Sequence, residues 1–208
     1  MTDRDFANAL VKFPTQSIVV INTASASGGF IKTLSAPNRT IITATKSSYE
    51  RNATLFGKYF VEAFAQDGAD VDKDDQVSVS EAFDYARREV VRLYEQENRL
   101  LTEHALLDDN GDGAGSDELD PMNGDGALAR RLFLRSTAEA AAAIASTDDP
   151  ELAALLTKQR DLQNQIAELR SRSDQIEPAE YEKELERLLL ELARTSQAVR
   201  AREKEKQP

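Results

Sequence analysis

Two short runs of β-branched and apolar residues dominate the hydrophobic pattern near the start of the chain. Residues 17–22 (SIVVIN) and 39–44 (RTIITA) are each bounded by turn residues, which is typical of strands. Between them, Gly28 and Gly29 lie in a turn that leads into a short apolar stretch, so a helix is expected to connect the strands. This strand–helix–strand order predicts a parallel, buried pair.

Three amphipathic helices are expected around this unit. Their apolar residues recur three or four positions apart, which places them on one face of a helix. The predicted ranges are residues 5–13, 53–65 and 80–97. Residues 128–135 are compatible with a strand or a helix, and we favour a last strand there.

The hydrophobic repeat changes near residue 149, where apolar positions begin to step alternately by three and four. Such steps form the heptad repeat of a coiled coil. Pro178 divides the pattern, because proline disfavours helix in the preceding residue and suits the first turn of a new one. The sequence therefore predicts an antiparallel helical hairpin. Its core positions are Leu152, Leu155, Gln159, Leu162, Ile166, Leu169, Ser173, Ile176, Tyr181, Leu185, Leu188, Leu192, Thr195 and Val199.

These patterns predict three consecutive parts. Residues 1–135 are expected to form an α/β domain, in which flanking helices cover a small sheet. Residues 136–148 are rich in alanine and are interpreted as a tether. Residues 149–208 are expected to form the C-terminal coiled-coil hairpin.

The charge balance argues against two classes of partner. The formal net charge is -11, and acidic residues cluster in two loops, so nucleic acid and anionic membrane surfaces are disfavoured. Cations or basic protein surfaces are better partners. The hairpin offers a surface for a protein partner or for self-association.

The cysteine content limits the possible chemistry, and the targeting signals bear on the location of the chain. The chain has no cysteine, which excludes disulfides, thiolate metal sites and thiol catalysis by its own residues. It has no run of about 18 apolar residues, and its first residues do not form a secretory signal. A cytoplasmic location is the default expectation, although a signal peptide could lie upstream if the chain is truncated.

One acidic stretch, residues 70–81 (DVDKDDQVSVSE), has the spacing of the twelve-residue EF-hand loop. A hard divalent ion needs about seven oxygen ligands, and this spacing wraps them round one centre, so Ca²⁺ is the fitting ion. Asp75 stands where the sharp turn favours glycine, and the alternative is a solvated acidic loop without an ion. The expected ligands, at positions 1, 3, 5, 7, 9 and 12, are Asp70, Asp72, Asp74, Gln76, Ser78 and Glu81.

A second acidic stretch, residues 108–119, begins in the same manner. Its twelfth position is Leu119, and Glu118 comes one place early, so the bidentate ligand is missing. Asn-Gly and Asp-Gly pairs mark turns, and a turn is the expectation here. Weak ion binding remains the alternative.

The segment 18–30 (IVVINTASASGGF) resembles the nucleophile strand and turn of the caspase-like peptidase domain, the group that contains caspases, metacaspases and legumain. Matching Ser27-Gly28 to the Ser-Gly of that family places Ser25 where the family has its cysteine. The likeness continues through residues 40–47 and 52–86. In all it covers roughly residues 5–135 and implies a partial caspase-like sheet.

The resemblance also implies what this chain lacks. The family has a catalytic histidine some tens of residues before the cysteine, whereas no histidine precedes Ser25 and the single histidine, His104, lies downstream. A serine needs a base within hydrogen-bond reach to become a nucleophile. The family also completes its sheet with upstream strands, so the chain is expected either to be truncated or to complete its sheet with a partner or a second copy.

Three functional hypotheses follow. The first is a catalytically inactive or truncated caspase-like peptidase homologue with a Ca²⁺-binding loop and an interaction hairpin. The second is a serine-type hydrolase that uses Ser25 with a base from a missing segment or a partner. The third is an interaction protein that acts through residues 149–208, with the α/β part as a carrier.

Overall fold

A computed structural model places the chain in two compact units. The first comprises Met1–Ala69 and Val77–Leu132, and the second comprises Asp70–Gln76 and Phe133–Pro208. The residues described are 2–65, 68–74, 76–122, 124–134, 147–172 and 176–205. Most of the expected tether, residues 136–148, lies outside them, as do Asp75 and Ser173.

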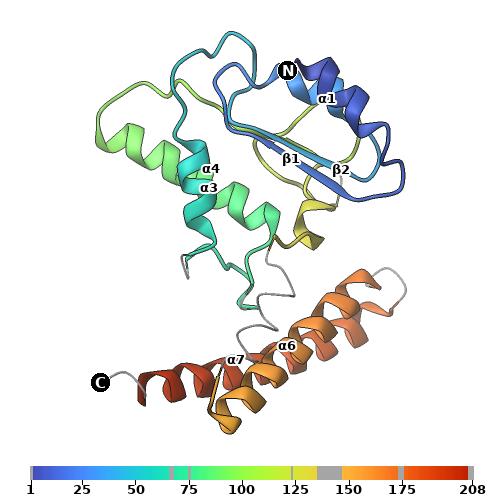
Figure 1. Cartoon of the computed structure of the whole chain (residues 1–208), viewed down its shortest axis with the longest axis vertical. Helices are drawn as coiled ribbons and strands as arrows, with labels where there is room; N and C mark the ends of the chain where they lie inside the picture. The colour runs from blue at the N-terminus through green and yellow to red at the C-terminus, as the bar shows by residue number, and fades with distance from the viewer. Residues whose placement is uncertain are drawn as a thin grey trace. The chain divides into compact units, whose positions relative to one another are not determined.

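The first unit contains a mixed three-stranded sheet in the order β1-β2-β3 (Figure 1). β1 (Ile18–Asn22) and β2 (Arg39–Thr43) pair in parallel, and α2 (Gly29–Leu34) connects them. This confirms the expected strand–helix–strand unit. β3 (Leu106–Asp108) pairs with β2 in the antiparallel direction and completes a sheet with β2 at its centre.

Alternate residues of the strands pack into two separate cores, because successive side chains of a strand point to opposite faces. Ile42 and Leu107 belong to the core formed with α3 (Phe56–Ala63) and α4 (Val79–Gln96). On the opposite face, Ile41 packs with the residues of α2. Helices therefore cover both faces of the sheet.

α1 (Asp3–Leu10) packs beside α2 on that second face. Thr2 begins α1 with a capping box, in which its hydroxyl accepts from the Asp5 amide and the Asp5 carboxylate accepts from the Thr2 amide. The Phe6 and Phe30 rings meet edge to face with centroids 5.9 Å apart, which joins α1 to α2.

Aromatic side chains fill the core between α3 and α4. The Phe56 ring contacts the rings of Phe60 and Phe83, with centroids 5.7 and 5.8 Å apart. Phe56 and Phe83 are fully buried, and burying one such side chain contributes roughly 1.5–3 kcal/mol. These contacts hold the two helices against the sheet.

Two expectations for the first unit differ from the structure. β1 is half-buried rather than buried, because it lies at the edge of the sheet. The strand expected over residues 128–135 is wrong, since Ala129–Arg131 forms a 3-10 helix, η1. Both carboxylate oxygens of Asp109 accept backbone amides, from Gly126 and Ala129, and this capping favours a helical turn.

The second unit contains two long helices, α6 (Pro150–Ser171) and α7 (Pro178–Glu205), that run in opposite directions (Figure 1). Pro150 stands in the first turn of α6, and the Asp149 carboxylate caps the amides of Glu151 and Leu152. The side chains packed between the helices are Leu162, Ile166, Leu169, Leu188 and Leu192, at positions of the expected repeat.

Polar contacts join the two helices along their length. Lys158 and Glu191 form an ion pair at 2.8 Å, and Arg202 reaches Asp149 at 2.9 Å. The Gln159 amide donates to the Ser196 hydroxyl at 3.0 Å, so one polar core position is satisfied across the pair.

None of the described helices has both the length and the apolarity needed to cross a membrane.

The two glycines after β1, Gly28 and Gly29, differ in how closely other atoms approach them. A Cβ atom at Gly28 would overlap the backbone of Lys46 and Ser47, whereas one at Gly29 would meet a single side-chain atom, the hydroxyl of the exposed Ser48, at 2.8 Å. Gly28→Ala should therefore lower the free energy of unfolding by about 2 kcal/mol or more, since backbone cannot move aside. Gly29→Ala should change it by less than about 0.5 kcal/mol. Urea denaturation of both variants measures the difference, and equal stabilities would contradict this packing.

Candidate functional site

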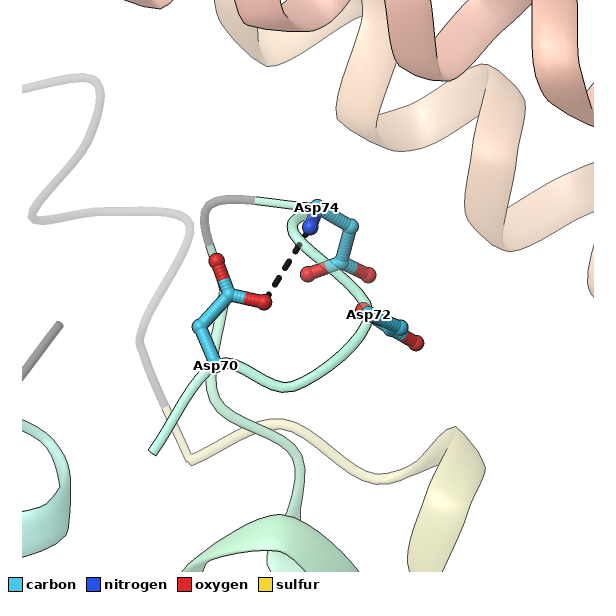
Figure 2. A group of neighbouring side chains, drawn as sticks. All are labelled: Asp70, Asp72 and Asp74. Atoms are coloured by element: carbon cyan, nitrogen blue, oxygen red, sulfur yellow. Dashed lines mark hydrogen bonds between the residues drawn. The ribbon is translucent and has the colours of Figure 1, made fainter. Parts of the chain in front are cut away.

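Three carboxylates converge in the loop that the sequence assigns to a cation. The side chains of Asp70, Asp72 and Asp74 offer ligand oxygens that all lie within 4.8 Å of one another. Figure 2 shows these side chains around the curve of the loop. No other group of three or more acidic or histidine side chains within the described ranges converges in this way.

Local hydrogen bonds curl the loop round its carboxylates. The Asp74 amide donates to Asp70 Oδ1 at 3.2 Å (Figure 2), and the Gln76 amide donates to Asp74 Oδ1 at 2.9 Å. Lys73 adopts a left-handed backbone conformation, with φ of 60°, and its ammonium reaches the Asp70 carbonyl at 2.7 Å. Residues in alternate positions can therefore direct oxygens to one centre.

A guanidinium from α6 neutralises part of this charge. Arg170 Nη1 donates to Asp74 Oδ2 at 2.6 Å, and Nη2 donates to Asp72 Oδ2 at 2.5 Å. The Arg170 side chain is only 11% exposed, and that of Asp74 only 2%. All these residues belong to the second unit, so the contact lies within one compact body.

The electrostatics of the loop follow from this crowding. Burial raises the pKa of Asp74 to about 7, and the negative charge of Asp72 acts in the same direction. The Arg170 guanidinium opposes both effects. The ionised form of the Asp74 carboxyl is therefore disfavoured by its surroundings, and a nearby positive charge favours that form.

The other expected ligands have local roles in the structure. The Gln76 amide turns the loop, as described above. Ser78 and Glu81 begin α4 with a capping box, in which the Ser78 hydroxyl accepts from the Glu81 amide and Glu81 Oε2 accepts from the Ser78 amide. The structure thus brings three of the six expected ligands together by their side chains, Asp70, Asp72 and Asp74.

The second acidic stretch follows β3 as a bent loop. Gly111 and Gly113 adopt left-handed conformations, with φ of 82° and 76°, which agrees with the expected turn. The carboxylate of Asp125 accepts from the amides of Asp109 and Asn110, while Asp109 caps η1. Asp109 and Asp125 therefore serve as internal acceptors for backbone amides.

Ser25 lies in the turn that follows β1. Its side chain is exposed, and the next residue, Ala26, has a left-handed conformation with φ of 59°. The turn is held by Thr45, whose hydroxyl accepts from the Gly28 amide and lies 3.1 Å from the Ser27 hydroxyl. Ser25 therefore lies on a turn whose backbone is fixed by hydrogen bonds.

The single histidine is engaged by a carboxylate. His104 Nδ1 lies 2.5 Å from Glu50 Oε1, and the His104 amide donates to Glu50 Oε2. The Glu50 carbonyl also accepts from the Ala26 amide, at 2.7 Å. Among the bonds between described residues, none joins the side chains of Ser25 and His104.

Sequence reasoning missed several of these groups. Arg170 lies 96 residues from Asp74, and nothing in the spacing of α6 marks it as a partner of the acidic loop. Glu103 was also missed: its carboxylate accepts from the amides of Leu55 and Phe56 and thereby starts α3 later than expected. Only the path of the chain brings such groups together.

No known protein family, curated protein or solved structure with which we compared the chain matches it.

The buried carboxylate of Glu103 should give a measurable pH dependence. Burial raises its pKa above the ordinary value of 4.5, although the Leu55 and Phe56 amides oppose the shift. The folded chain then binds more protons than the unfolded chain between these two pKa values, so the contribution of Glu103 to stability falls as pH rises through that interval.

Glu103→Gln removes this titration. The unfolding free energy of the natural chain, taken relative to that of Glu103→Gln, should therefore decrease as pH rises from 4.5. Urea denaturation at a series of pH values measures the difference. The exposed Glu95→Gln is the matched control and should show no such trend, and a pH-independent difference for Glu103→Gln would contradict the assignment.

Proposed function

We propose that this chain is a catalytically inactive, caspase-like module that binds Ca²⁺ through residues 70–81 and makes protein contacts through its helical hairpin. The observation that carries the proposal is the convergence of Asp70, Asp72 and Asp74 in a loop with EF-hand spacing. The other two parts of the proposal draw on the resemblance and on the helix pair.

Calcium fits the donor set of the loop. Ca²⁺ takes six to eight oxygen ligands, and carboxylates from alternate residues are its usual donors in such loops. The three aspartates supply positions 1, 3 and 5, and the spacing assigns the Gln76 carbonyl, Ser78 and Glu81 to the remaining positions. A hard divalent cation would also offset the repulsion among the three carboxylates.

Inactivity as a peptidase rests on the chemistry of the chain. There is no cysteine, so the thiolate of the caspase-like mechanism has no counterpart among these residues. Ser25 stands at the aligned position, and a serine hydroxyl needs a neighbouring base to attack a carbonyl. The chain has one imidazole, that of His104, and no hydrogen bond between the described residues joins its side chain to that of Ser25.

The helix pair α6 and α7 supports a role in contacts. Its leucine positions follow a heptad repeat and pack against each other, so we propose that residues 149–208 form a coiled-coil hairpin that is satisfied by its own two arms. A partner or a second copy would then use the outer surface, where Leu190 is 52% exposed. In the interaction hypothesis this surface is the main functional feature.

Calcium binding is tested by titration with a matched pair of variants. Ca²⁺ should raise the melting temperature of the natural chain, and a chelator should reverse the rise. Glu81→Gln should weaken binding at least about tenfold, because it removes the bidentate ligand while glutamine still completes the capping box of α4. Isothermal titration calorimetry measures the affinities.

Glu95→Gln, on the exposed surface of α4, is the control because it changes the net charge equally without touching the loop. It should bind Ca²⁺ like the natural chain. A melting temperature that stays constant up to about 1 mM Ca²⁺, the weak end of such sites, would remove the ion from the proposal if it stays constant both in the natural chain and in Arg170→Ala, which lacks the guanidinium on Asp72 and Asp74.

The absence of catalysis is tested with a fluorophosphonate probe, which labels activated serines. The natural chain should remain unlabelled under conditions that label a known serine hydrolase, because Ser25 lacks a base. Labelling that disappears in Ser25→Ala but persists in Ser48→Ala, a nearby exposed serine, would support the serine hydrolase hypothesis instead.

A further inference from the structure

We propose that Arg170 is an internal counter-ion of the acidic loop, and that a divalent cation and the Arg170 guanidinium compete for the same carboxylates. The inference rests on the proposed cation site and adds a regulation to it. Without the cation, α6 and the loop are joined by Arg170; with the cation bound, Arg170 is released.

The geometry places the guanidinium on two ligands of the expected ion. Its two terminal nitrogens bind one oxygen of Asp72 and one of Asp74, which hold positions 3 and 5 of the loop. A planar guanidinium with two prongs bridges neighbouring carboxylates better than an ammonium does. Arg170 thus takes oxygens that a calcium ion would need.

Burial makes the two cations mutually exclusive. The Arg170 side chain is 11% exposed and the Asp74 side chain 2%, so little water screens the charges at this place. A divalent ion held by Asp72 and Asp74 would face the guanidinium at short range and repel it. The carboxylates can therefore satisfy one cation or the other.

Two other arginines of the hairpin pair with glutamates on the exposed surface. Arg172, two residues further along α6, pairs with Glu168 at 3.3 Å, and its side chain is 54% exposed. Arg187 of α7 pairs with Glu184 and Glu191 on the exposed surface. Arg172 is therefore the natural control for the charge of Arg170.

The test is calorimetric titration of Ca²⁺ into the full chain and two variants. Arg170→Ala should bind Ca²⁺ at least about tenfold more tightly than the natural chain, since the ion no longer has to displace the guanidinium. Arg172→Ala should bind like the natural chain. Tighter binding confined to Arg170→Ala supports the competition, and so does binding by Arg170→Ala when the natural chain binds nothing measurable.

Two further outcomes overturn the inference and are distinguishable. Equal or weaker binding by Arg170→Ala leaves the calcium site intact and removes the competition alone. If neither chain binds, the proposed cation site falls and the competition falls with it.

A measurement on the natural chain covers the case in which Arg170→Ala does not fold. The Nη protons of Arg170, which donate to Asp72 and Asp74 and are assigned by their loss in Arg170→Lys, should exchange slowly with solvent without Ca²⁺ and at least about tenfold faster at saturating Ca²⁺. Exchange that stays slow at saturation would show that the guanidinium keeps its place, and would overturn the proposal.

Discussion

Burying a carboxylate costs solvation free energy unless hydrogen-bond donors or a cation compensate it, and this constraint governs how the acidic chain folds. Glu103 and Asp109 are buried, and each accepts backbone amides that would otherwise have no partner at the start of a helix or turn. Asp125 does the same for the loop after β3. These three acidic side chains therefore act as internal acceptors for backbone amides.

In the acidic loop 70–76, a cationic side chain as well as backbone amides compensates the carboxylates. Backbone amides of the loop bind carboxylate oxygens of Asp70 and Asp74, and the Arg170 guanidinium binds carboxylate oxygens of Asp72 and Asp74. In the proposed exchange, a divalent cation would replace the guanidinium on Asp72 and Asp74 as the positive charge at these carboxylates. The raised pKa of Asp74 reflects the same crowding.

The turn after β1 holds Ser25 at the surface of the first unit. The turn that carries Ser25 is held by Thr45 and by the Glu50 carbonyl, so its backbone is well supported. Support of the backbone does not activate a hydroxyl, however, because activation needs a base at hydrogen-bond distance. No hydrogen bond between the described residues joins the Ser25 side chain to that of His104, whose Nδ1 lies 2.5 Å from Glu50 Oε1.

Local features of the fold could be predicted from the sequence alone. β1, β2 and α4 follow from apolar runs and periodicity, and the capping box of Ser78 and Glu81 involves residues only three apart. The convergence of Asp70, Asp72 and Asp74 is equally local, because alternate residues of one tight loop must lie near one another.

Tertiary structure decided the features that join distant residues. β3 is only three residues long and is stabilised by pairing with β2, and η1 depends on Asp109, twenty residues before its first residue. The pairing of Glu50 with His104 spans 54 residues, and that of Asp74 with Arg170 spans 96. Such contacts depend on the path of the whole chain, because the free energy of a long-range pair is gained only after packing has brought its partners together.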